Sequence, residues 1–244
     1  MIRTLLLRGM LAGILAGLLV FAFARLVGEP QVEHAIQIEM QLDAVHGDAD
    51  HHEPEPETIT RTIQRGVGLL TGVVLYSVAI GGLFSLVFAF AYGRIESLRP
   101  RVLSIVLAGL GFVAIVLVPM VKYPANPPAV GSPDTIGIRT GAYFLLLAFS
   151  ILMMSLCFKI GRTIRYRVGA WNAALLAGGL YLLLISTIAY FLPVIDEVPA
   201  AFPASLLWRF RIAALGIQGV LWTSLGLLFG WFAERELTKS VNPI

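Results

Sequence analysis

Six long apolar runs constrain the fold of this chain more than any other feature. At 1.5 Å per residue, each run is long enough as a helix to cross most or all of a hydrocarbon layer about 30 Å thick. Of the 244 residues, 57% are hydrophobic and only 14% are charged. The runs cover residues 5–27, 67–92, 102–118, 140–158, 170–192 and 206–232. We therefore predict an all-α, polytopic bundle of six transmembrane helices that forms a single integral membrane domain over residues 1–244.

The first run carries three glycines at four-residue spacing, Gly9, Gly13 and Gly17. Small residues on one helix face allow a neighbouring helix to approach closely, so we expect this face to pack against another span. A cleaved signal peptide is the alternative, because Ala22-Phe-Ala24 resembles a small-residue cleavage site. The run is longer than a usual signal sequence, and we expect an uncleaved span. Five spans would remain if it were cleaved or if another run were re-entrant.

A proline-rich segment separates the third run from the fourth. Residues 119–133 contain five of the 13 prolines. Proline has no backbone N–H, and it pushes the preceding residue out of the helical region, so no helix can cross residues 124–133. We expect a central break at 119–133 whose carbonyl oxygens lack matching amide donors and can serve as cation ligands.

Lysine and arginine are distributed unevenly between the two ends of the runs. Cytoplasmic loops are enriched in these residues, so the richer side is assigned to the cytoplasm and both termini are predicted to lie there. The opposite side then holds residues 28–65, 121–139 and 194–205. The net charge of +3 is explained by this orientation and does not indicate a nucleic-acid partner.

All four histidines lie in the outer segment 28–65, among many carboxylates. Imidazole and carboxylate together suit divalent first-row metals such as Co²⁺, Ni²⁺ or Zn²⁺. We expect residues 32–44 to form a short helix on which Glu29, Glu33 and Gln37 align, and residues 47–57 to be mobile. The alternative is a solvated acidic loop without a metal. The candidate metal ligands are His34, His46, His51, His52, Glu29, Glu33 and Glu39.

Polar residues close to membrane depth are candidates for a translocation path, because they are costly to place there. The candidates are Lys122, Asn126, Arg211 and Gln218. Arg211, Gln218 and Trp222 share one face of the sixth run. The amide of Gln218 lies two turns inside this run and therefore needs a hydrogen-bond partner. In the alternative interpretation, Lys122, Arg139, Arg209 and Arg211 extend their long side chains to the membrane surface, and Gln218 bonds a neighbouring helix.

Aromatic side chains lie mostly near the ends of the runs, where they are typical of an interfacial belt. This interpretation is preferred over a cofactor site for the following residues: Trp171, Tyr181, Trp208, Trp222 and Trp231. Cys157, the only cysteine, is expected to be a small core residue.

The motifs of common hydrolases are absent from the sequence. We find no Gly-x-x-x-x-Gly-Lys-Ser/Thr phosphate loop, no Gly-x-Ser-x-Gly elbow and no His-Glu-x-x-His pair. The chain is therefore not expected to be an enzyme or to hydrolyse ATP, and any driving force must come from an ion gradient or a partner. Three spans in each half would permit an inverted repeat, although the halves show no convincing sequence similarity.

Several motifs together resemble the CbtA family of proposed cobalt transporter subunits over nearly the whole chain. They are Gly28-Glu-Pro30 with Glu33, Lys122-Tyr-Pro-Ala-Asn-Pro-Pro-Ala-Val-Gly131, Arg139-Thr-Gly141, Asp196-Glu-Val-Pro199, Leu207-Trp-Arg-Phe-Arg211, Gln218-Gly-Val-Leu-Trp222 and Leu225-Gly-Leu-Leu-Phe-Gly230. The resemblance implies an inner-membrane protein that takes part in cobalt uptake for cobalamin synthesis. It also implies a partner, a small single-span B subunit that contains histidine. Such proteins are usually described with five spans, whereas this sequence predicts six.

The residues and the resemblance favour a membrane subunit of an uptake system for cobalt or a related divalent ion. The ion is then a substrate, and no permanently bound cofactor is expected. The alternative is a non-transporting membrane assembly or metal-sensing protein that binds a partner subunit through its glycine-rich helix faces.

Overall fold

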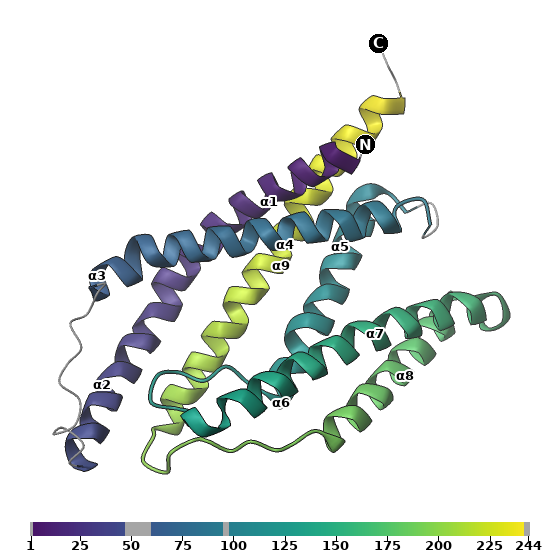
Figure 1. Ribbon diagram of the computed structural model, residues 1–244. Helices are drawn as coiled ribbons and strands as arrows, with labels where there is room; N and C mark the ends of the chain where they lie inside the picture. Colours follow the sequence, from purple (N-terminus) through teal and green to yellow (C-terminus); the bar gives the residue numbers. More distant parts are fainter. Residues whose placement is uncertain (1, 47–59, 95–97, 242–244) are drawn as a thin grey trace. The chain divides into compact units, whose positions relative to one another are not determined.

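The computed structural model describes residues 2–46, 60–94 and 98–241 of the chain. Within these ranges every regular element is helical, which confirms the all-α prediction (Figure 1). Segments η1, η3 and η4 are π-helical, η5 is a 3₁₀ turn, and the others are α-helices. The elements are α1 (Ile2–Phe23), η1 (Ala24–Gly28), α2 (Glu29–His46), α3 (Arg61–Ile63), η3 (Gln64–Gly68), α4 (Leu69–Ala91), α5 (Pro100–Gly111), η4 (Phe112–Leu117), α6 (Val118–Lys122), η5 (Pro133–Thr135), α7 (Ile136–Val168), α8 (Ala170–Phe191) and α9 (Ala204–Val241).

Six helical stretches of the described chain are long and apolar enough to cross a membrane, as predicted. Some are longer than the apolar runs, because the helices continue through polar residues. The helix expected at 32–44 is α2, which continues directly from α1 through η1. The six stretches are Ile2–Leu42, Arg61–Ala91, Pro100–Lys122, Pro133–Val168, Ala170–Phe191 and Ala204–Thr238.

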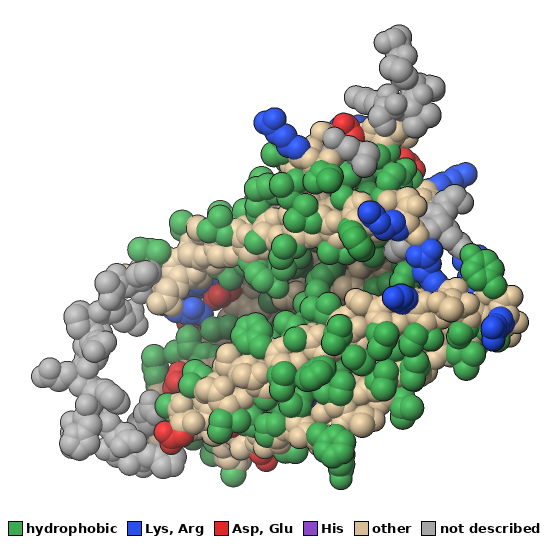
Figure 2. Space-filling model, turned by 45° about the vertical axis from the view of Figure 1, so that its right-hand side comes forward, with side chains coloured by type: hydrophobic (Ala, Val, Ile, Leu, Met, Phe, Trp, Pro, Cys, Tyr) green, Lys and Arg blue, Asp and Glu red, His purple; other side chains and the backbone are tan. Residues whose placement is uncertain are grey.

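Large apolar side chains remain exposed along these helices, and Figure 2 shows hydrophobic side chains over much of one face. Leu83 and Phe90 of α4 are 60% and 70% exposed, and Leu182 and Phe191 of α8 are 60% and 81% exposed. A soluble protein rarely leaves so much apolar surface in water. The exposed surface therefore fits contact with lipid.

The chain divides into two compact units. Unit 1 comprises Met1–Gly109, Pro127–Ala129 and Phe202–Ile244. Unit 2 comprises Leu110–Asn126 and Val130–Ala201.

Unit 1 is built on close contact between α1 and α4, which cross in Figure 1. A Cβ atom added at Gly13 would collide with the carbonyl oxygen of Ser77 and would lie 2.9 Å from Cα of Val78. At Gly17, the same atom would lie 3.1 Å from Cα of Val74. On α4, a Cβ at Gly81 would collide with the carbonyl oxygen of Gly9. The predicted packing role of the glycines in the first run is therefore confirmed, since only glycine permits backbones this close.

In the same unit, α9 packs against α5 and α1. A Cβ atom at Gly226 would lie 2.7 Å from Cβ of Ala108, and one at Gly230 would lie 3.1 Å from Cβ of Ser104. The Ser104 hydroxyl donates a hydrogen bond of 2.7 Å to the Gly226 carbonyl oxygen. The glycines near the end of the sixth run therefore serve helix packing, and one of them also exposes a carbonyl to a neighbouring helix.

Unit 2 is centred on a hydrogen-bonded core between η4, α7 and α8. The Ser150 hydroxyl donates to the carbonyl oxygen of Ala114 at 2.7 Å, and the Tyr181 hydroxyl lies 2.8 Å from it. Because the single Ser150 proton goes to Ala114, the Tyr181 hydroxyl must donate to Ser150. Ala114 lies in the π-helical η4, where the regular α-helical bonding pattern is interrupted. The two hydroxyls therefore stabilise an irregular turn inside an apolar span.

The proline-rich break is shorter than predicted. Residues 124–132 contain no helix, but the preceding helix continues through Pro119 to Lys122, so the expected boundary at 119 is wrong. A proline ring normally clashes with the carbonyl oxygen four residues earlier. Here the wider π-helical turn of η4 comes directly before α6 and changes that spacing. At the end of the helix the buried Tyr123 donates a 2.8 Å hydrogen bond to the Pro193 carbonyl oxygen, and burial raises its pKa.

The aromatic residues do not all form an interfacial belt. Trp171 and Trp208 are 76% and 66% exposed, as a belt requires. Tyr181 and Trp222 are instead buried, so the prediction is wrong for these two residues.

Replacing Gly81 by Ala should destabilise the protein by about 1–3 kcal/mol, because the added methyl group collides with the backbone of α1. The free energy of unfolding in mixed micelles measures the effect. Gly72→Ala is a matched control in the same helix, since a Cβ there meets no atom within 4 Å. The control should be neutral or slightly stabilising, because alanine favours helix more than glycine does. Equal effects of the two substitutions would contradict the close contact of α1 with α4.

Candidate functional site

The helix α2 carries Glu29, Glu33 and Glu39, and one arginine holds the first two. Glu29 and Glu33 lie one turn apart, at the spacing that places both on one face. The Nη2 atom of Arg61 lies 2.9 Å from Oε2 of Glu29, whose side chain is only 11% exposed. The Nε atom of Arg61 lies 3.9 Å from Oε2 of Glu33, an ion pair too long for a hydrogen bond. The guanidinium therefore compensates part of the carboxylate charge where a metal ion was expected.

Glu39 interacts with the backbone of the proline-rich segment. Its Oε1 atom accepts a hydrogen bond of 3.3 Å from the backbone N–H of Ala129. Ala129 has a φ of 66°, the left-handed conformation that residues other than glycine adopt uncommonly. The carboxylate of Glu39 thus anchors residues 127–129, which belong to the same unit as α2.

His34 lies in an open pocket of about 270 Å³ between α2 and the first turns of α9. Gln37 and Gln41 follow it at three and seven residues, so the three side chains share one helix face. Ser205 and Arg209 line the opposite wall. The positive charge of Arg209 opposes a bare cation in this pocket, whereas the imidazole, amide and hydroxyl groups can bind a hydrated ion or an anion.

The side chains of the other three histidines lie outside the described part of the chain. His46 is the last residue of α2, and its side chain is not described. His51 and His52 lie outside the described residues. Within the part of the chain that the structure describes, no three histidine, cysteine or carboxylate side chains lie close enough to hold a metal ion together.

The candidate path residues belong to both units. Lys122 ends α6 in unit 2, with its Nζ atom 5.9 Å from the centre of the Tyr123 ring, and Asn126 follows in the non-helical segment. Arg211 and Gln218 lie on α9 in unit 1. The side-chain oxygen of Gln218 is buried and has no hydrogen-bond partner among the described residues.

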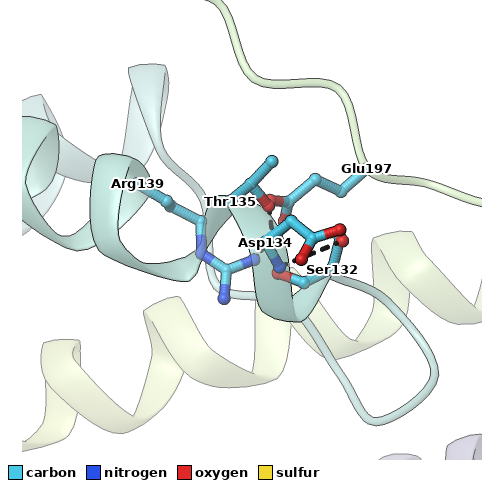
Figure 3. Close-up of polar contacts among 5 residues, drawn as sticks. All are labelled: Ser132, Asp134, Thr135, Arg139 and Glu197. Carbon is cyan, nitrogen blue, oxygen red and sulfur yellow. Dashed lines mark hydrogen bonds and ion pairs between the residues drawn. The ribbon is translucent and has the colours of Figure 1, made fainter.

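Sequence reasoning missed a buried ion pair in unit 2. Arg139, near the start of α7, pairs with Glu197, whose side chain is only 5% exposed. Glu197 also accepts a hydrogen bond from the Thr135 hydroxyl (Figure 3). Gly131 makes room for the pair, since a Cβ atom there would lie 2.9 Å from Nη1 of Arg139. Gly131 also has a φ of 134°, which favours glycine. Both charged residues lie in the motifs quoted from the sequence, but they are 58 positions apart, and so the pairing cannot be read from the sequence.

Unit 1 has further ion pairs near the C-terminal end of α9. Arg8 of α1 pairs with Glu236 and also donates to the carbonyl oxygen of Phe232. Arg101 of α5 pairs with Glu234. Both acids of this end of α9 are thus neutralised by arginines from other helices, which indicates a structural role.

These features define a multi-pass α-helical membrane protein whose described carboxylates are mostly paired with arginine. The chain belongs to the family described as probable cobalt transporter subunit (CbtA), whose model matches residues 2–234. No curated protein matches the chain, and no solved structure matches it.

The Arg139 pair predicts an asymmetric response to substitution. Arg139→Gln leaves the buried Glu197 carboxylate without its cation and should cost about 3 kcal/mol of unfolding free energy. Glu197→Gln should cost less, because Arg139 is 27% exposed and can reach solvent. In the double variant the two losses should not add, since the unpaired buried charge is gone.

A double-mutant cycle measured by unfolding in mixed micelles checks this result. Arg167→Gln, at an exposed position, serves as the control and should stay within about 0.5 kcal/mol of wild type. Strictly additive effects of Arg139→Gln and Glu197→Gln would refute the interaction.

Proposed function

We propose that the chain is a membrane subunit of an uptake system for Co²⁺ or a related divalent ion, serving cobalamin synthesis. The observation that carries this proposal is the family match over residues 2–234, whose description names cobalt transport. The outer helix α2 supports it, because it combines an imidazole with several carboxylates, a ligand set suited to divalent first-row metals.

In this proposal the outer segment concentrates the ion before it reaches the bundle. His46, His51 and His52 collect the ion, and Glu29, Glu33, His34 and Glu39 receive it. Because Arg61 already pairs with Glu29 and Glu33, a dication must displace the guanidinium to bind these carboxylates. The dication and the guanidinium therefore compete for the same carboxylates, which makes binding reversible, as a transport site requires.

The proposed path uses polar groups of the proline-rich segment and of α9. Backbone carbonyl oxygens near Lys122 and Asn126 replace part of the hydration shell of the ion, as in channels and broken-helix transporters. The fixed charge of Lys122 limits how long a dication stays. Arg211 and Gln218 form the polar face of α9, and Gln218 contributes an oxygen ligand.

The chain itself carries out no catalysis in this proposal and works within a larger transport system. The ion is its substrate, and no cofactor is bound permanently. The driving force comes from an ion gradient or from a partner. The proposed partner is a small single-span B subunit that contains histidine.

We further propose that the protein lies in the cytoplasmic (inner) membrane with both termini in the cytoplasm. The asymmetry of lysine and arginine supports this orientation. In intact cells, an impermeant thiol reagent should label Asp134→Cys, at an exposed outer position, and spare Tyr166→Cys. Cys157 is buried and needs no replacement. The reverse labelling pattern would invert the orientation.

Uptake of radioactive Co²⁺ into vesicles tests the function directly. Vesicles that contain the chain, with or without its partner, should accumulate Co²⁺ above protein-free vesicles. Replacing His46, His51 and His52 together by Asn should raise the half-saturating Co²⁺ concentration and leave the maximal rate nearly unchanged, because these residues act in capture. Vesicles that contain the chain and its partner but take up no Co²⁺ would instead favour a non-transporting assembly or a metal sensor.

A further inference from the structure

Two polar atoms on α9 are buried in unit 1 without a hydrogen-bond partner among the described residues. One is the side-chain oxygen of Gln218, an acceptor, and the other is the indole N–H of Trp222, a donor. Trp222 is only 6% exposed, so bulk solvent does not satisfy the indole. Because buried polar groups in proteins are nearly always hydrogen-bonded, the pair indicates a bound molecule.

The helix places these two side chains on the same face of α9. Gln218 and Trp222 are four residues apart, so they lie on one face of α9 with Cβ atoms about 5–6 Å apart. A hydrogen bond to each side chain spans about 2.8–3.0 Å. One oxygen atom placed between them can therefore contact both.

The known neighbours of the indole are an aromatic ring and two leucines. The Phe84 ring packs edge-on against Trp222, with ring centres 6.4 Å apart and an angle of 76° between the planes. Leu221 and Leu225, which lie beside them on α9, are apolar and fully buried. The indole ring is thus held in place among groups that cannot accept its proton.

The bound molecule must accept a hydrogen bond from Trp222 and donate one to Gln218. A bare cation can do neither, and a side chain of a second protein cannot reach a position this buried. Water can do both, and buried water commonly satisfies polar groups that have no other partner. We propose that a single water molecule is bound between Gln218 and Trp222 inside unit 1.

The water site adds a detail to the proposed transport path, and this detail rests on the proposed function. Gln218 is one of the path residues, and the bound water donates a hydrogen bond to the side-chain oxygen that is proposed as an ion ligand. A dication that reaches Gln218 therefore meets this water first and keeps at least part of its hydration shell at this level of α9.

The test detects magnetisation transfer from water to the indole N–H groups of the nitrogen-15-labelled chain in lipid nanodiscs. The four tryptophans give four indole signals, and Trp222→Phe identifies the one from Trp222. In the wild-type protein this signal should show a cross-peak to water. Gln218→Leu removes the acceptor and should weaken the cross-peak several-fold. Thr223→Val, the same kind of change at an exposed position of α9, should leave it unchanged.

Two results overturn the proposal. One is a wild-type Trp222 signal without a water cross-peak, and the other is an undiminished cross-peak in Gln218→Leu. The wild-type spectrum decides the first point even if Gln218→Leu does not fold. Since cobalt plays no part in the readout, this test and the vesicle uptake test can fail independently.

Discussion

Hydrocarbon offers no hydrogen-bond partner, and this constraint governs the polar groups of the whole structure. Arginine and carboxylate residues pair near helix ends, as Arg139 does with Glu197 and Arg8 with Glu236. Within the spans, serine hydroxyls bond to carbonyl oxygens of neighbouring helices. Ser104 bonds to Gly226, and Ser150 bonds to Ala114. The helices are therefore held together by close backbone contact and by a few satisfied polar groups, since lipid is as apolar as their side chains.

Features that depend on local sequence could be predicted, and those that depend on tertiary contact could not. The apolar runs predicted all six spans, and the spacing of Gly9, Gly13 and Gly17 predicted a closely packed helix face. The continuation of the helix through Pro119 escaped prediction, because it depends on the π-helical turn of η4. Neither composition nor periodicity indicates such a turn.

The candidate site was predicted only in part. The spacing of Glu29 and Glu33 indicated a common helix face, but not that Arg61, about thirty residues later, would pair with both of them. Likewise, the sequence places Arg139 at a helix end and Glu197 in a separate motif, and it does not indicate that the two residues pair. A partner distant in sequence is set by the fold, and a single sequence contains no signal for it.

The paired carboxylates refine the view of metal capture on α2. A site that already contains a guanidinium has part of its negative charge compensated, so clustered carboxylates destabilise the protein less in the absence of metal. Metal binding then becomes an exchange, and its apparent affinity is lowered by the energy needed to displace Arg61. Weak, exchangeable binding suits a protein that passes an ion onward.

The exchange can be measured directly through the Co²⁺ affinity of Arg61→Gln in lipid nanodiscs. Removing the competing guanidinium should lower the half-saturating Co²⁺ concentration about tenfold, which corresponds to about 1.4 kcal/mol. The measurement is made on folded protein, confirmed by its helical circular dichroism. If the folded variant binds Co²⁺ with unchanged or lower affinity than wild type, then Glu29 and Glu33 do not bind the metal and their pairing with Arg61 is purely structural.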